Sequence, residues 1–343
     1  MKKTAVIWPY KFENFYPGIS PQNSWERRFQ WITKALQKEG YDIIQHPKFL
    51  CDIPDSIEYK GDRECDLVIY NHADMSEIKG DVIQAKKTWF FKPTVPDENQ
   101  CTLDELGYGP FSSPTYKRPD LESIPAADVK KFFNTQVKKW KRDNSCKWGN
   151  DKFKKEKTTD RNFYLVLGQV FNDSVVTRHS WSNYFDQLIQ VLQELNSWTE
   201  DKIIVKLHPY TNGKIFPLPE GDFDFIKDAT EKIHKISNDI KVISDFTSVH
   251  SLLPHAKCVM LANSGCGFEA MMYKKPVISW AHPEYHWVTY DLRRRSDVFN
   301  AIKTKNWFDK DLSDRFLYWY MREYCIYDEA SAERRVKELL KNE

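Results

Sequence analysis

Residues 258 to 287 constrain the fold of this chain more than any other stretch. An apolar run ending at Ala262 predicts a buried strand, and the small residues from Asn263 to Gly267 predict a tight turn. A helix is expected from Cys266 to Tyr273 and a second short strand from Pro276 to Trp280. A strand, turn and helix in this order aim free backbone N–H groups and the positive end of the helix dipole at one point, which suits a phosphate group. A corner whose glycines serve packing alone is an equally good interpretation of this segment.

The chain as a whole limits the classes of protein to consider. At 343 residues it is long enough for two domains with a cleft between them, and a composition of 41% hydrophobic and 29% charged residues is that of a globular protein. The net charge of +2 gives no general attraction to nucleic acid. Seven cysteines without a C-x-x-C pair favour reduced thiols, and no apolar run reaches the roughly 20 residues that span a bilayer. We therefore expect a cytoplasmic protein, at most peripheral to the inner membrane.

Strand and helix patterns alternate along most of the sequence. Strands are expected at residues 4–8, 42–45, 66–70, 88–91, 162–168, 202–207, 241–244 and 257–261. Helical periodicity is present at residues 25–36, 184–195, 225–236 and 249–253. This alternation predicts an α/β fold with parallel sheets, and the second half of the chain has the pattern of a Rossmann-like domain. No G-x-G-x-x-G fingerprint occurs, which argues against a dinucleotide cofactor.

A lysine-rich stretch from residue 126 to 157 provides the expected domain boundary. We place an N-terminal domain at residues 1–157, a C-terminal domain at residues 158–310, and a helical segment at residues 311–343 that can pack back on the first domain. The stretch interleaves basic and aromatic residues, as in Lys138-Lys-Trp-Lys-Arg142, which could serve an anionic membrane surface or nucleic acid. A solvated helix and connector is the more frequent meaning of such a pattern.

Polar residues follow three of the expected strands in the second domain. They are Gln169 with Asn172 and Asp173, then Lys206 with His208 and Pro209, and then Ser264 with Gly265, Gly267 and Glu269. Because the carboxyl ends of parallel strands meet at one edge of a sheet, we expect these groups to converge on one crevice. A single histidine at a strand end is more often structural, so the prediction depends on the convergence. In the first domain, Tyr70-Asn-His72 also ends a strand.

The motifs Gly-Gln-x-x-x-Asp, Lys-x-His-Pro and Ser-x-x-Gly-Phe-Glu-Ala, followed by Lys-Lys-Pro-Val, resemble those of the capsular polysaccharide synthesis family of bacterial β-Kdo transferases, the KpsC and KpsS type. The resemblance covers residues 160 to 290. In the first half it is limited to Asp104-Glu-Leu-Gly-Tyr108, which is similar to an acidic-x-Gly-aromatic element of that family.

The resemblance implies a glycosyltransferase of GT-B architecture, with two facing Rossmann-like domains. It also implies CMP-Kdo as donor and a glycan or lipid-linked acceptor. By the same resemblance, Asp173 is the catalytic carboxylate, His208 and Ser264 contact the nucleotide phosphate, and Glu269 lies near the ribose. Glu105 matches only a short motif and is the candidate base. The family often has a second acid before the catalytic aspartate, but this chain has Asn172 there, which weakens any scheme that needs two acids.

The implied chemistry is also reasonable on physical grounds. A carboxylate such as Asp173 stabilises the oxocarbenium-like transition state of a retaining transfer, by charge or by a covalent adduct. His208, Ser264 and backbone N–H groups would stabilise the leaving phosphate, and Glu105 would deprotonate the acceptor. The scheme requires no metal or other cofactor, and the sequence shows no cluster of metal ligands.

Two groups of alternatives stay open. The same architecture serves UDP- or GDP-sugar transferases, nucleotide-sugar 2-epimerases and CDP-polyol phosphotransferases. A protein of another class, without catalytic activity, could use the lysine-rich stretch to bind nucleic acid or an anionic glycan. We expect a nucleotide sugar and a glycan as partners, and no nucleic acid.

Overall fold

The structure is a computed structural model. It describes residues 3–8, 22–45, 57–58, 64–71, 84–147, 149–151, 153–170, 174–209, 224–304 and 306–341. The chain forms two compact units. Unit 1 comprises Met1–Lys117 and Tyr318–Glu343, and unit 2 comprises Arg118–Leu317.

Unit 1 is built on a six-stranded sheet of order β3-β2-β1-β4-β5-β6. Its strands are β1 (Lys3–Trp8), β2 (Tyr41–Gln45), β3 (Ile57–Glu58), β4 (Glu64–Asn71), β5 (Gln84–Pro93) and β6 (Cys101–Asp104). The first five strands pair in parallel, and β6 is antiparallel to β5. The other elements are α2 (Gln22–Lys38), η1 (Gly109–Phe111), α3 (Ser113–Tyr116), η4 (Tyr320–Tyr324) and α13 (Glu329–Lys341).

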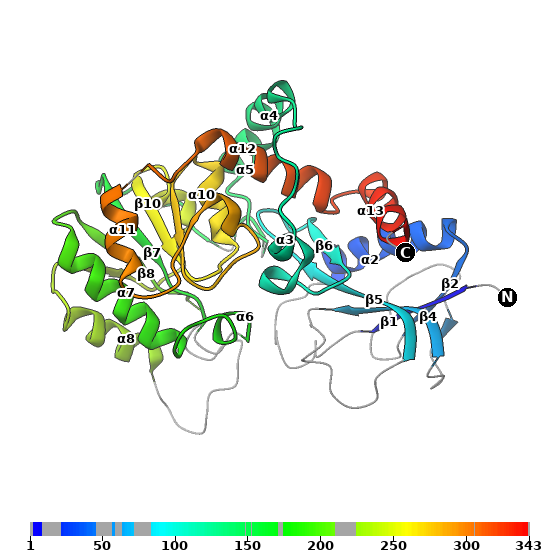
Figure 1. The fold of residues 1–343 in the computed structure, drawn as a ribbon, viewed down its shortest axis with the longest axis horizontal. Coiled ribbons are helices and arrows are strands. Elements are labelled where there is room, and N and C mark those ends of the chain that lie inside the picture. Colours follow the sequence, from blue (N-terminus) through cyan, green and yellow to red (C-terminus); the bar gives the residue numbers. More distant parts are fainter. Residues whose placement is uncertain are drawn as a thin grey trace. The chain divides into compact units, whose positions relative to one another are not determined.

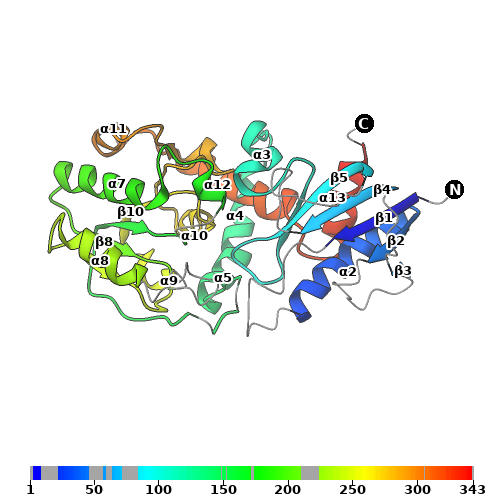
Figure 2. The ribbon, with the colours of Figure 1, turned by 90° about the horizontal axis from the view of Figure 1, so that it is seen from below.

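The helices α2 and α13 lie side by side on one face of this sheet (Figures 1 and 2). The helical spacing of Phe29, Ile32 and Leu36 places these side chains in a single core with Val336 and Leu339 of α13. The same core contains the side chains that alternate strand residues direct to this face. The C-terminal segment of the chain thereby completes the N-terminal domain.

Unit 2 contains a second six-stranded sheet, of order β12-β11-β10-β7-β8-β9, in which all pairs are parallel. Its strands are β7 (Phe163–Leu167), β8 (Ile203–Lys206), β9 (Lys241–Ile243), β10 (Ala256–Leu261), β11 (Val277–Ser279) and β12 (Tyr290–Asp291). Its helices are α4 (Ala126–Phe132), η2 (Phe133–Val137), α5 (Lys138–Asp143), α6 (Ser174–Thr177), α7 (Tyr184–Trp198), α8 (Phe225–His234), α9 (Val249–Leu252), α10 (Cys266–Met272), η3 (His286–Val288) and α11 (Asp297–Thr304). Helix α12 (Lys310–Trp319) crosses the division between the units.

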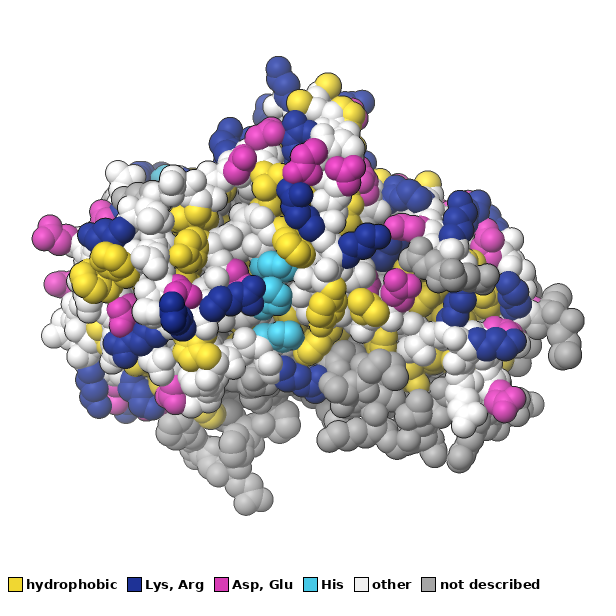
Figure 3. Space-filling view, viewed as in Figure 1, with side chains coloured by type: hydrophobic (Ala, Val, Ile, Leu, Met, Phe, Trp, Pro, Cys, Tyr) yellow, Lys and Arg dark blue, Asp and Glu magenta, His cyan; other side chains and the backbone are white. Residues whose placement is uncertain are grey.

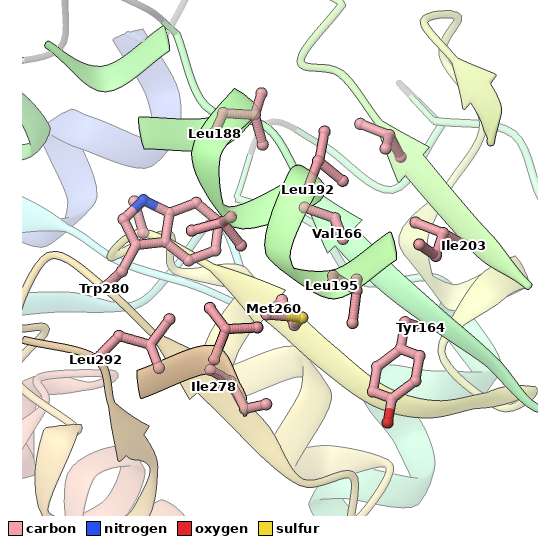
Figure 4. Close-up of a cluster of buried hydrophobic side chains, with 14 of the residues drawn as sticks. Tyr164, Val166, Leu188, Leu192, Leu195, Ile203, Met260, Ile278, Trp280 and Leu292 are labelled. Atoms are coloured by element: carbon pink, nitrogen blue, oxygen red, sulfur yellow. The ribbon is translucent and has the colours of Figure 1, made fainter. Parts of the chain in front are cut away.

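One face of the second sheet is covered by α7, α8 and α11. Leu188, Leu192 and Leu195 of α7 pack on Val166 and Met260 of the central strands (Figure 4). The helix α11 runs beside α7 in both ribbon views. Strands buried on both faces have continuous apolar runs, which is why the strand at residues 163–167 could be identified from the sequence.

The unit boundary differs from the expected one. The sequence suggested boundaries near residues 157 and 310, whereas the structure divides the chain after Lys117 and after Leu317. The reason is that the lysine-rich stretch belongs to unit 2. Its Ser145 carbonyl accepts a hydrogen bond from His250, and Ser248 donates to Asn144. Composition identified a basic segment but carried no information about these contacts.

Candidate active site

The expected convergence is a property of the second sheet. Strand β7 lies between β10 and β8, with Leu167 paired to Leu261 on one side and to Lys206 on the other. The three strands therefore end at the same level. The residues that follow them, including Gln169, His208 and Asn263, start from one edge of the sheet, where open parallel sheets bind ligands.

A pair of amide side chains joins two of these strand ends. Gln169 Nε2 donates to Asn263 Oδ1 at 3.0 Å, and the Asn263 backbone N–H donates to Gln169 Oε1 at 2.9 Å. Asn263 Nδ2 also donates to the carbonyls of Val175 and Ala281. Both side chains are buried. Gln169 thus fixes the geometry of the edge. Its partner Asn263 begins the third strand-end motif, but the sequence did not single it out as a site residue.

Lys206 and His208 lie at the end of β8. Lys206 is buried and donates from Nζ to the Asp245 carbonyl at 3.0 Å, and burial lowers its pKa although Asp245 acts in the opposite direction. Burial lowers the pKa of His208 to about 3, and the charges of Lys147 and Lys206 contribute to this shift. His208 is therefore a neutral imidazole at neutral pH. It can donate a hydrogen bond to a phosphate oxygen but adds no positive charge. Pro209, next in the chain, is partly buried.

The turn between β10 and α10 contains Ser264, Gly265 and Gly267. Ser264 Oγ accepts a hydrogen bond from the Cys266 N–H at 3.2 Å, and the Ser264 carbonyl accepts one from the Tyr285 hydroxyl at 2.6 Å. A Cβ atom on Gly267 would lie 2.4 Å from the Tyr285 ring. Glycine is required at position 267 because the fully buried Tyr285 occupies that space.

Glu269 lies in the first turn of α10 and is 4% exposed. Its Oε1 is 3.9 Å from Nε2 of His250, which is 3.1 Å from the Ser145 carbonyl, while Nδ1 is 2.9 Å from the Tyr273 hydroxyl. Because the carbonyl only accepts, Nε2 of His250 carries the proton. Burial lowers the pKa of His250 despite Glu269. The structure thus places Glu269 in a buried polar network, and its contact with a ribose stays a prediction.

Some predicted residues cannot be placed. Asp173 lies outside the described residues, as do Asn172 and His72. The catalytic role of Asp173 therefore stays a prediction from its sequence motif.

The two neighbouring acids of unit 1 occupy opposite environments. Asp104 has no exposed surface and accepts hydrogen bonds from the Tyr324 hydroxyl at 2.8 Å and from the Ser113 hydroxyl at 2.5 Å. Arg335 of α13 lies 3.5 Å from its Oδ2. Glu105, the candidate base, is exposed. Asp104 is a structural anchor, and only Glu105 of the two is accessible to a substrate.

The lysine-rich stretch begins with the helices α4, η2 and α5. Its apolar residues Phe132, Val137 and Trp140 are buried. Lys139 and Arg142 both pair with Asp143, and Lys141 lies over the Tyr273 ring at 4.5 Å. Part of its charge is thus compensated within unit 2.

Among the described residues, no group of three or more His, Cys, Asp or Glu side chains is arranged to hold a metal ion. In the same ranges no helix combines the length and the hydropathy that crossing a membrane requires.

Comparison with known proteins identifies the family. Residues 114–327 match the model of a family described as capsule polysaccharide biosynthesis proteins, which is more than half of the chain. The chain belongs to this family. It is also 29% identical, over 121 residues, to the capsule polysaccharide export protein KpsS of Escherichia coli. That match covers 34% of this chain and 29% of the length of the relative.

Two solved structures share the fold. One is the β-Kdo 2,4 transferase of Thermosulfurimonas dismutans KpsC, with a TM-score of 0.54 and 15% identity over 95% of this chain and 92% of that chain. The other is the β-Kdo 2,7 transferase of the same KpsC, with a TM-score of 0.51 and 14% identity over 99% of this chain and 100% of that chain. The two α/β units, each built on a sheet of mainly parallel strands, are thus the Rossmann-like domains of a GT-B fold, as expected.

Proposed function

We propose that this protein is a glycosyltransferase of capsule or surface polysaccharide synthesis that transfers Kdo from CMP-β-Kdo to a glycan or glycolipid, with retention. The observation that carries the proposal is the meeting of three motif-bearing strand ends at one edge of unit 2, in a chain of the capsule polysaccharide family. The two solved structures compared above are described as β-Kdo transferases, which supports the choice of sugar.

The donor would bind at this edge. The Ser264 hydroxyl, whose oxygen accepts from the Cys266 N–H, would donate its own proton to the phosphate. His208, being neutral, would donate a second hydrogen bond. Gln169 and Asn263 would keep the strand ends at a fixed spacing, because their two mutual hydrogen bonds are buried.

In the first step we assign the nucleophile to Asp173. A carboxylate oxygen of Asp173 forms a bond to the anomeric carbon while the bond from that carbon to the CMP phosphate breaks, and the electron pair leaves with CMP. In the second step the acceptor hydroxyl attacks the same carbon and releases Asp173. Glu105 would take the hydroxyl proton. No step requires a metal or another cofactor.

If the acceptor is the glycolipid, the basic residues 138–142 would contact an anionic membrane surface. Lys138 is exposed, and Lys139 and Arg142 would exchange their pairing with Asp143 for lipid headgroups, at about 1 kcal/mol for each well-placed charge.

A panel of nucleotide sugars tests the proposal. Purified protein is incubated with CMP-Kdo, other CMP-sugars, UDP-sugars, GDP-sugars and CDP-polyols, and the released nucleotide is identified by chromatography. We expect release of CMP from CMP-Kdo, increased by a glycan acceptor. Release of UDP or GDP alone would contradict the donor assignment, and an inverted product would exclude the covalent route.

A further inference from the structure

Two histidines of unit 2 are stacked in the segment between β11 and β12. The ring centroids of His282 and His286 are 4.0 Å apart, with an angle of 35° between the ring planes. Trp287 extends the stack, with its ring 4.2 Å from that of His286. Neither histidine was singled out by the strand-end motifs, and the mechanism above does not use them.

The hydrogen bonds of the pair fix where the protons are. His282 Nδ1 is 2.7 Å from Asp291 Oδ2, and His286 Nδ1 is 3.0 Å from the Pro283 carbonyl. A carboxylate and a carbonyl only accept, so each Nδ1 carries a proton, and in its neutral form each ring has its lone pair on Nε2. Within the described part of the chain, neither Nε2 has a hydrogen-bond partner. The loop therefore presents two adjacent hydrogen-bond acceptors.

The surroundings hold this arrangement in place. Asp291 also accepts from the Ser279 hydroxyl at 3.3 Å and pairs with Arg293 at 3.1 Å. The backbone of His282 has φ = 46°, a left-handed conformation that side-chain-bearing residues rarely adopt. Burial lowers the pKa of His286 to about 4, with His282 and Arg293 acting in the same direction and Asp291 against it. His286 is thus neutral at neutral pH.

The pair lies beside the proposed phosphate site. Tyr285, three residues from His282 and adjacent to His286, donates its hydroxyl to the Ser264 carbonyl. Asn263, the residue before Ser264, donates from Nδ2 to the carbonyl of Ala281, the residue before His282, at 3.1 Å. The loop follows β11, the neighbour of β10 in the sheet, and so leaves the same edge. His282 and His286 are both partly exposed. Histidine side chains reach the surface on the face drawn in Figure 3.

We propose that His282 and His286 bind hydroxyl groups of the donor sugar through their Nε2 lone pairs and so contribute to donor specificity. This inference rests on the proposed function. Lone pairs repel the oxygens of a phosphate but accept hydrogen bonds from hydroxyls, so a polyol fits this part of the edge. The same lone pairs would suit a transition metal, but among the described residues no third ligand completes such a site.

Matched variants distinguish the role of the Nε2 acceptor from that of the ring. His286→Phe keeps a ring against His282 and removes the acceptor, and His282→Phe tests the second ring. His286→Gln restores an acceptor oxygen near the position of Nε2. His234→Phe, at an exposed position at the end of α8, is the control.

For each variant, kcat/KM for the donor and the inhibition constant of CMP are measured. We expect each phenylalanine variant to lower kcat/KM by about threefold to tenfold, the effect of one neutral hydrogen bond, with the CMP constant unchanged. The glutamine variant should recover part of the loss.

Unchanged kcat/KM in both phenylalanine variants, with active wild type, refutes the inference and leaves the proposed function intact. Equal weakening of CMP and donor also refutes it, because the loop then acts on the nucleotide. If EDTA abolishes activity and Zn²⁺ restores it only when both histidines are present, the lone pairs hold a metal instead. A wild type that uses no nucleotide sugar refutes the proposed function together with the inference.

Discussion

Asp104 and Glu105 are adjacent acids, and their substitution by the matching amides should have opposite effects. Asp104→Asn removes the charge that receives hydrogen bonds from Ser113 and Tyr324 and that faces Arg335. Each bond to a charged acceptor is stronger than its neutral equivalent by about 1 kcal/mol. Breaking a fully buried ion pair costs about 3 to 5 kcal/mol. Because Arg335 keeps its pairing with Glu338 in the variant, most of the ion-pair cost is avoided. The two weakened hydrogen bonds and the remainder of that cost give an expected loss of about 3 kcal/mol in the free energy of unfolding.

The assay is urea unfolding monitored by tryptophan fluorescence. The transition of unit 1 is the one that should shift to a lower urea concentration in Asp104→Asn. Glu105→Gln should change stability by less than about 0.5 kcal/mol, as expected for an exposed position. Glu105→Gln should instead lower the rate of transfer to an acceptor and leave the affinity for CMP unchanged. The reasoning is refuted if Asp104→Asn unfolds like the wild type, or if Glu105→Gln loses stability and keeps full turnover.

The variant Asp173→Asn should still bind CMP, but its transfer rate should fall by orders of magnitude. Intact-protein mass spectrometry with donor alone should show one added Kdo on the wild type and none on the variant. Near-normal turnover of the variant would exclude the catalytic role. Replacing Lys138, Lys139, Lys141 and Arg142 by glutamine should weaken binding to anionic vesicles in a co-sedimentation assay, with activity on a soluble acceptor unchanged, and equal vesicle binding would contradict a membrane role. The depressed pKa of His208 means that the unfolded chain binds a proton below about pH 6.5 that the folded chain binds only near pH 3. Stability should therefore fall as the pH is lowered through that window, and His208→Gln should make the fall shallower; an unchanged slope would show that the imidazole is not buried in solution.

Much of the architecture was predictable because its signals are local. The apolar runs at residues 163–167 and 256–261 predict strands whatever surrounds them, and Gly40 marks the end of α2. The antiparallel strand β6 was not predicted, because Cys101–Asp104 is too short to show a period. Its pairing depends on contacts far along the chain, including those of Cys101 with Ile326.

The membership of each unit was harder to predict than its strands. Arg335 reaches Asp104 across 231 residues, and Trp140 is buried although it lies within a lysine run. From the sequence alone, Arg335 is an ordinary charged helix residue and Trp140 is part of a solvated connector. Such assignments depend on tertiary packing, which a window of sequence does not contain.

The candidate site shows the same limit at the level of side chains. The motifs drew attention to Gln169, Lys206 and His208 together, but the structure assigns them different tasks. Gln169 is held by Asn263, and Lys206 donates to the Asp245 carbonyl, so both stabilise the sheet edge. A substitution at either position would lower activity by moving the strand ends, even if neither side chain touches the donor. Kinetic loss at a motif residue therefore becomes evidence of substrate contact only when the variant retains the unfolding free energy of the wild type.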